Sequence, residues 1–154
     1  MSITHHPLTE QHKREICSWH YPEPYAAYDL LPYETMREKQ SGFMNPNREK
    51  NFHGFSIGDT LIGFVNILEK TTEIFIGIGV HPDYCNRGYG RQILNITTEL
   101  AHELFPGKPL CLEVRTWNTR AVNCYLRAGF TIDGEPFEQT TGMGKGTFYR
   151  MIKS

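Results

Sequence analysis

The sequence has almost no net charge and no long hydrophobic run. Lys and Arg number 16 against 17 Asp and Glu, which leaves a formal net charge of −1 at pH 7. A broad basic surface for nucleic acid or for an anionic membrane is therefore not expected. The longest nearly apolar stretch, Ile74–Val80, contains two glycines and is far shorter than the ~20 residues of a membrane-spanning helix. We expect a soluble protein that binds neither nucleic acid nor membrane.

Closely spaced cysteines and a leader segment are absent as well. Cys17, Cys85, Cys111 and Cys124 lie too far apart in the sequence to form the close pairs of zinc or redox motifs, and the histidines show no metal-ligand spacing. The N-terminal MSITHHP has no basic segment followed by an apolar run, as a signal peptide requires. These absences predict free thiols, no metal site and a cytoplasmic location.

The chain is long enough to bury its own hydrophobic core. A length of 154 residues, 39% of them hydrophobic, is typical of one globular domain. No internal repeat, low-complexity tract or linker interrupts it. We therefore predict a single domain that spans residues 1–154.

Periodicity and breaker residues predict the order of the elements. Two helices, one begun by Thr9 and running to about Trp19 and one begun by Pro32 and running to Gln40, are expected in an N-terminal third that is otherwise irregular and has no strand. Strands at 52–57 and 60–68 form a hairpin through Gly58-Asp59, and a third strand follows at 73–80. A helix from Gly88, with Leu104 on its buried face, a strand at 110–114, a helix at 119–128 and closing strands at Phe130 and 148–152 complete the order.

This order of segments indicates the fold class. An antiparallel run followed by one crossover unit predicts an α/β (α+β) fold. We expect a mixed, largely antiparallel sheet of about six to seven strands flanked by about four helices.

The segment from Val80 to Arg91 (VHPDYCNRGYGR) combines a strand end, a loop and a helix start. Unpaired N–H groups and the helix dipole attract anions there, and glycines at 88 and 90 let a phosphate approach the backbone. Arg87 and Arg91 add forked donors that suit phosphate oxygens. The segment predicts a local anion site suited to a pyrophosphate, unless the glycines serve only to turn the chain.

Two common nucleotide fingerprints are not met. The dinucleotide motif needs a small residue where Ile93 stands, and the phosphate-loop motif needs a lysine followed by a hydroxyl residue that this segment lacks. A second motif lies downstream, in which Asn118, Ala121, Tyr125, Gly129 and Phe130 follow the strand LEVR.

Together the two segments resemble the GNAT superfamily of acyl-CoA-dependent N-acyltransferases. Its cofactor loop reads Q/R-x-x-G-x-G/A, and its second half reads N-x-x-A-x-x-x-Y-x-x-x-G-F after a strand. The second pattern is matched at every step, whereas Cys85 stands where the first has Gln or Arg. LEVR before Asn118 is most similar to the branch that acetylates protein N-terminal amines, including the N-terminal alanine of ribosomal proteins. That branch tends to carry a Tyr-Tyr pair after the Gly-Phe, and this chain does not.

The resemblance implies the GNAT fold, transfer of an acetyl group from acetyl-CoA to a primary amine by direct attack on the thioester, and coenzyme A as product. The acceptor would be a protein N-terminus or a small-molecule amine. A non-catalytic acyl-CoA sensor or scaffold is the alternative, and the presence of Tyr125 favours the enzyme. Homodimers are common in the superfamily, so the resemblance leaves a homodimer open.

The resemblance also implies roles for individual residues. The pyrophosphate would lie on Asn86–Arg91, and the pantetheine arm would pair with the strand backbone at Ile78–Val80. The expected cofactor contacts are Ile78, Gly79, Val80, Cys85, Asn86, Arg87, Gly88, Tyr89, Gly90, Arg91 and Asn118. Asn118 has a second interpretation as a helix cap.

Catalytic roles follow from the same resemblance. Tyr125 stands where the family places its general acid. Glu113 matches the base of the N-terminal acetyltransferase branch, Glu73 is the competing candidate, and a water relay is the third. Trp19, Tyr21, Tyr25 and Tyr28 lie where the superfamily varies with substrate, so they line an acceptor pocket or pack in the core.

Overall fold

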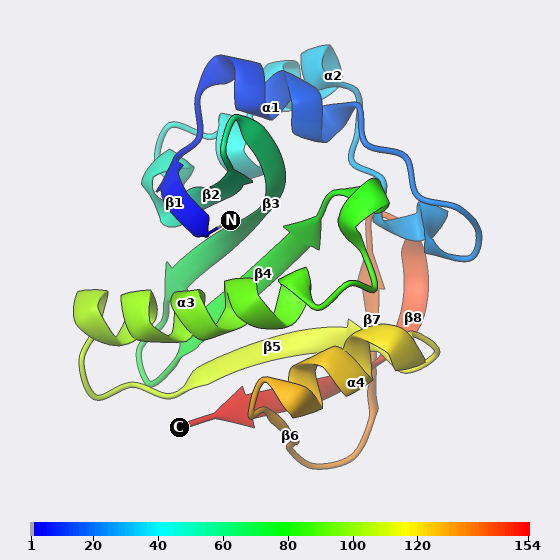
Figure 1. The fold of residues 1–154 in the computed structure, drawn as a ribbon. Helices are drawn as coiled ribbons and strands as arrows, with labels where there is room; N and C mark the ends of the chain where they lie inside the picture. Colours follow the sequence, from blue (N-terminus) through cyan, green and yellow to red (C-terminus); the bar gives the residue numbers. More distant parts are fainter. Residues whose placement is uncertain (1) are drawn as a thin grey trace. The chain divides into compact units, whose positions relative to one another are not determined.

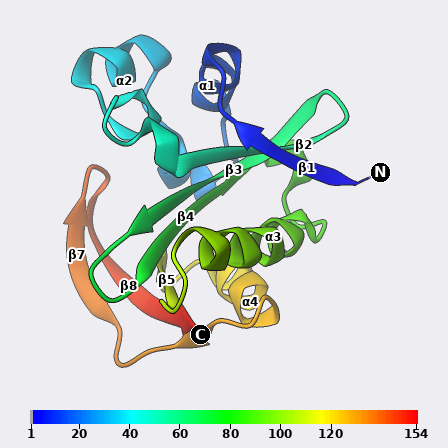
Figure 2. The same ribbon diagram turned by 90° about the vertical axis from the view of Figure 1, so that its left-hand side faces the viewer.

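The computed structural model describes residues 2–154 and divides the chain into two compact units. The first comprises the chain up to Asn66 together with Ile78–Cys85, and the second comprises Ile67–Gly77 together with Asn86–Ser154. Strands β3 (Thr60–Glu69) and β4 (Ile74–Val80) run through both units. The ribbon is drawn in Figure 1 and, turned by 90°, in Figure 2.

The first unit is built on an antiparallel ladder. β1 (Ile3–Pro7) pairs with β2 (Phe52–Ile57), which pairs with β3 across the predicted hairpin turn. The sequence prediction missed β1. Its pattern ITHHP exposes three of five residues and contains no hydrophobic alternation, because it is an edge strand paired only with β2 (Figure 2).

Two short helices follow β1 in the first unit. α1 (Glu10–Cys17) begins as predicted at Thr9, whose hydroxyl accepts from the N–H of His12, while Nδ1 of His12 accepts from the N–H of Thr9. This reciprocal capping satisfies two N–H groups at once. α2 (Tyr33–Lys39) begins directly after Pro32.

These helices pack on an apolar cluster that forms the core of the first unit. Its buried members come from β2, β3, both helices and the loops: Leu8, Ile16, Cys17, Trp19, Met36, Phe43, Phe52 and Leu61. The aromatic residues in this cluster account for part of the aromatic content of the N-terminal third.

The second unit places helices and strands around β5 (Leu110–Arg115). α3 (Tyr89–Leu104) precedes β5, and α4 (Thr119–Arg127) follows it. β8 (Gly144–Lys153) pairs antiparallel with β5, with β6 (Thr131–Ile132) and with β7 (Phe137–Thr141). β4 pairs with β5 in parallel.

The hydrogen-bonded order of the sheet is β1-β2-β3-β4-β5-β8-β6, with β7 paired to β8. Residues 2–154 thus contain eight strands and four α-helices, and the sheet is mixed and mostly antiparallel. The predicted fold class is confirmed. Among the same residues no helix is long and apolar enough to cross a membrane.

Three local predictions were wrong. β7 was not expected, because FEQTT has one hydrophobic residue and no hydrophobic alternation, yet it forms a hairpin with β8. Phe130 was expected to start a strand, but its N–H bonds to the carbonyl of Tyr125 as part of the α4 terminus, and the strand starts at Thr131. Leu104 was expected on the buried face of α3 but is 48% exposed, because the helix ends there.

Candidate active site

The end of β4 belongs to the first unit and is held there by the N-terminal segment. The hydroxyl of Tyr21 donates to the carbonyl of Val80 at 2.7 Å, and the N–H of His81 donates to the carbonyl of Ile62 at 2.8 Å. A Cβ at Gly79 would collide with the ring of Phe64. Gly79 is therefore needed for the close approach of an aromatic side chain, and this explains one of the two glycines that the sequence singled out.

The aromatic segment after α1 is divided between the core and the surface. Trp19 is 5% exposed and packs against Phe64 and His81, with ring centroids 6.1 and 5.0 Å apart. Core packing is thus the role of Trp19 that the structure supports. Tyr21 lies against Val80 through its hydroxyl, and Tyr28 is exposed. The sequence showed these aromatics but not the contact between residue 21 and residue 80.

Cys85 lies in the loop between β4 and α3 and is the last residue of the first unit. Its thiol points back to the strand end, 3.7 Å from the carbonyl oxygen of Val80 and 3.5 Å from that of His81. The side chain therefore braces the loop against its own strand. A Gln or Arg at this position would be longer and would carry a stronger donor.

In the second unit, α3 begins with backbone groups that no side chain caps. Gly88 is the N-cap at φ 85°, its side-chain position has no atom within 4 Å, and the first turn contains no acidic residue. Arg87 and Arg91 are exposed beside it. A helix of this length whose first turn no side chain caps, with nearby guanidinium groups and an open approach to the backbone, suits an anion. The residues fit a pyrophosphate.

β4 and β5 pair only at their beginnings. Ile74 is in register with Leu110 and Phe75 with Cys111, and no later pair joins the two strands within the second unit. β4 nevertheless continues through Gly77 and β5 through Arg115. The two strands thus share no register pair beyond Phe75 and Cys111 in the second unit, and the pairing of a pantetheine arm with β4 stays a prediction.

Asn118 caps α4. Its Oδ1 accepts from the N–H of Ala121 at 3.1 Å, and the residue is 7% exposed. The capping interpretation is confirmed, whereas a contact with the cofactor stays a prediction. Tyr125 lies two turns further along α4, is half-buried and packs edge-on against Phe130 with centroids 6.5 Å apart.

The two carboxylates considered as base lie in different environments. Glu113 on β5 is exposed, and Oε1 accepts a hydrogen bond from Nε2 of Gln139 at 3.0 Å. Glu73 forms a two-pronged ion pair with Arg150, with N–O distances of 2.8 and 2.6 Å. Arg150 also binds Asp133, so it joins two carboxylates from separate loops.

The ion pair changes the acidity of its members. Hydrogen bonds from Arg150, and then from Cys111, lower the pKa of Glu73 to about 2. Burial and the bond to Glu73 raise the pKa of Cys111 to about 11, so Cys111 stays a thiol and donates to Oε2 of Glu73 at 2.9 Å. A carboxylate of such low pKa is a weak proton acceptor at neutral pH. Sequence reasoning missed Arg150, which lies 77 residues from Glu73 along the chain.

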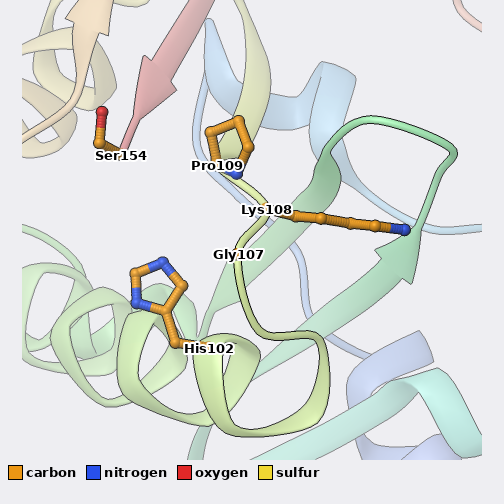
Figure 3. A pocket seen from close by; sticks show the side chains of 5 residues that line it. All are labelled: His102, Gly107, Lys108, Pro109 and Ser154. Atoms are coloured by element: carbon orange, nitrogen blue, oxygen red, sulfur yellow. The ribbon is translucent and has the colours of Figure 1, made fainter.

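A surface pocket of the second unit lies elsewhere. His102, Gly107, Lys108, Pro109 and Ser154 line it (Figure 3). Nζ of Lys108 is taken up by Glu69 and by the carbonyl of Lys70. None of the predicted site residues lines this pocket.

Comparison with known proteins decides the family. The model of the acetyltransferase (GNAT) family matches residues 13–130. The chain belongs to this family. It is an acetyl-CoA-dependent N-acetyltransferase that acts on an amine.

Two relatives with known activities are similar in sequence. Spermidine N(1)-acetyltransferase of Vibrio cholerae is 26% identical over 131 residues, which cover 82% of this chain and 72% of that protein. N-alpha-acetyltransferase of Sulfurisphaera tokodaii is 26% identical over 113 residues, which cover 71% of this chain and 66% of that protein.

Solved GNAT structures share the fold. Spermidine N-acetyltransferase from Vibrio cholerae, in complex with CoA and spermine, matches with a TM-score of 0.76 at 19% identity and covers 97% of this chain and 94% of that chain. Ribosomal-protein-S18-alanine N-acetyltransferase from Escherichia coli matches with a TM-score of 0.68 at 18% identity and covers 99% and 93%.

Proposed function

We propose that this acetyltransferase acetylates the terminal α-amine of a peptide or protein, with Glu113 as general base and Tyr125 as general acid. The observation that carries the proposal is the contrast between Glu113, which Gln139 orients, and Glu73, which Arg150 neutralises. The LEVR-x-x-N motif, similar to the branch that acetylates ribosomal-protein N-terminal alanine, supports the same acceptor. We further propose that residues 1–154 act as one GNAT domain.

Acetyl-CoA supplies the acetyl group as a thioester. Backbone N–H groups at Gly88–Arg91 and the guanidinium groups of Arg87 and Arg91 would hold its pyrophosphate, and the edge of β4 at Ile78–Val80 would hold the pantetheine arm. Cys85, Asn86 and Asn118 complete the proposed contacts. Arg87 and Arg91 would compensate for the side-chain contact that a Gln or Arg at position 85 makes in other members.

Glu113 would accept the proton that the acceptor amine must lose. The carboxylate is exposed, is oriented by one neutral donor and takes part in no ion pair among residues 2–154. An α-amine has an ordinary pKa of about 8, so part of it is already neutral at physiological pH and the base must deprotonate only the remainder. Glu73 is the weaker candidate because Arg150 holds its pKa far below that of an amine.

Tyr125 would deliver its phenolic proton to the departing thiolate. A phenol with an ordinary pKa of about 10 is a weaker acid than a thiol with a pKa of about 8.5, so proton transfer to the thiolate is slightly unfavourable. A positioned general acid tolerates a pKa difference of this size. This proton transfer would need no other ionisable group of α4.

A polyamine acceptor is the second candidate, because relatives in Vibrio cholerae are named for spermidine. A polyamine carries several cationic amines and needs several unpaired carboxylates. Glu113 lies on one face of β5, β7 and β8, where Arg150 binds both Glu73 and Asp133. Glu138 lies on the opposite face of β7 and is paired with Lys145. The pairing of these carboxylates favours an acceptor with one amine.

Free-thiol release with acetyl-CoA tests the proposal on a matched panel of acceptors. We expect faster turnover with an alanine-terminated tripeptide than with spermidine or with the same tripeptide blocked by an N-terminal acetyl group. Preference for spermidine would assign the polyamine acceptor instead. If acetyl-CoA binds tightly but none of these acceptors leads to release of free thiol, the non-catalytic sensor is favoured.

A further inference from the structure

Arg115 is the one arginine or lysine on the Glu113 face of β5 and β8 for which the described residues offer no carboxylate. Arg150 on β8 binds Glu73 and Asp133. For Arg115 the structure gives a single polar contact, from Nη2 to the hydroxyl of Thr141 at 3.1 Å. A guanidinium has five N–H donors, so most of this donor capacity is available for a ligand.

Strand geometry places this guanidinium beside the proposed base. Glu113 and Arg115 are two residues apart on β5, so their side chains leave the same face with Cα atoms roughly 7 Å apart. The register agrees, because Glu113 lies opposite Arg150 and Arg115 lies opposite Phe148 on β8. Gln139 and Thr141 of β7 contact Glu113 and Arg115 respectively, which puts both contacts on this face.

The side chain of Arg115 is positioned before any ligand binds. Its guanidinium lies 4.8 Å above the ring centroid of Phe148, which also stacks on Phe137. A Cβ at Gly146 would collide with Nη1 of Arg115. The missing side chain at position 146 therefore gives the guanidinium the room to lie flat against the β7–β8 hairpin, where the aromatic ring holds its plane.

We infer that Arg115 determines acceptor specificity by binding the carbonyl or carboxylate oxygen that follows the reactive amine. This inference rests on the proposed α-amine acceptor and names what accompanies the amine. An amine near Glu113 and an oxygen near Arg115 match the first residue of a peptide, whose amine and carbonyl are joined by one carbon. A polyamine has no such oxygen and would meet a positive charge at this place.

The test compares two acceptors in four variants. One acceptor is an alanine-terminated tripeptide, and the other is the same molecule with its first carbonyl reduced to a methylene. Arg115→Gln removes the charge, Arg115→Lys keeps the charge without the fork, and Gly146→Ala keeps Arg115 but displaces it. Lys145→Gln, which breaks an exposed pair on the same hairpin, is the control.

We expect Arg115→Gln to raise the KM for the tripeptide roughly tenfold or more, with a smaller change in kcat, because a hydrogen bond to a charged group is lost. The KM for the reduced acceptor should not rise in this variant, because that molecule lacks the carbonyl oxygen and its new secondary amine carries a positive charge that Arg115 repels. Gly146→Ala should act in the same direction, Arg115→Lys should recover part of the preference, and Lys145→Gln should change neither acceptor. Thermal unfolding of each variant shows whether the hairpin is intact.

Two outcomes overturn the inference in different ways. Equal losses with both acceptors, or no loss with the tripeptide, would make Arg115 a structural residue while the proposed function stands. A wild type that turns over spermidine but neither tripeptide nor reduced acceptor would remove the proposed function and this inference together.

Discussion

Glu73 and Arg150 form a two-pronged ion pair that joins the start of β4 to β8, with N–O distances of 2.8 and 2.6 Å. Side-chain exposures of 19% for Glu73 and 33% for Arg150 keep part of the pair away from water. Arg150 also reaches Asp133, and Cys111 donates to Glu73, so four side chains of the second unit share one network. Arg150 and Cys111 thereby hold the Glu73 carboxylate in a stabilising network.

This network predicts a loss of stability in acid. The pKa of Glu73 is about 2 in the folded chain against an ordinary value of 4.5, so the folded state binds this proton more weakly than the unfolded state. The stabilisation is complete above about pH 5 and is lost as the pH falls toward 2. We expect roughly 2 kcal/mol in urea unfolding between these limits, absent in Glu73→Gln. Parallel pH profiles of the wild type and the variant would contradict this.

Removal of the proposed base should slow the enzyme in a pH-dependent way. Glu113→Gln keeps the shape and the contact with Gln139 but cannot take a proton, so kcat/KM should fall roughly 100-fold where the acceptor amine is protonated and less where it is neutral. Glu73→Gln is the matched control and should not change the shape of the profile. A Glu113→Gln profile parallel to that of the parent would exclude this residue as base and favour a water relay.

Tyr125→Phe should separate catalysis from cofactor binding. The change removes one hydroxyl and keeps the ring that packs on Phe130. We expect kcat to fall roughly 100-fold, while the dissociation constant of acetyl-CoA, measured by calorimetry, changes little. Unchanged turnover at saturating acetyl-CoA would remove Tyr125 from the mechanism.

Arg87→Ala should weaken the binding of coenzyme A. One charged donor to the pyrophosphate would be lost at the start of α3, so the dissociation constant should rise about tenfold and its dependence on salt should weaken. Lys50→Ala, an exposed cation of the first unit, is the control. Equal affinity of Arg87→Ala and the parent would refute the placement of the pyrophosphate.

Two histidines of the first unit should destabilise it in mild acid. Burial lowers the pKa of His12, with a further contribution from His6, and burial lowers the pKa of His53, with a contribution from His5. The unfolded chain therefore binds these protons more readily, and stability should fall as the pH drops below about 6.5. His12→Gln retains a capping residue at this position, so it should flatten the profile between pH 7.5 and 5.5. Urea midpoints measure the difference.

The sequence was sufficient where the signal is local. Glycine at the start of α3, Thr9 before α1 and the Gly58-Asp59 turn each specify backbone geometry within a few residues, and all three were predicted. β1 and β7 were missed because an edge strand needs one partner and little hydrophobic alternation. Their pairing energy comes from residues far away in the chain.

The candidate site shows the same division. Asn118 and Tyr125 follow from a motif with fixed spacing on one helix, so their positions on α4 could be predicted. The sequence could not predict that Arg150 pairs with Glu73, because 77 residues separate them, and our proposal of Glu113 as base depends on that pair. The period of two along LEVR places Arg115 beside Glu113, but its packing over Gly146 depends on the β7–β8 hairpin, which lies about 30 residues further along the chain.

The short pairing of β4 with β5 has a consequence for the lifetime of the enzyme. The ladder between β4 and β5 ends after Phe75 and Cys111, so the later residues of the two strands do not pair with each other in the second unit. If acetyl-CoA pairs with the later part of β4, as we propose, it binds the native chain and not the denatured one, so it should protect the protein against unfolding and degradation.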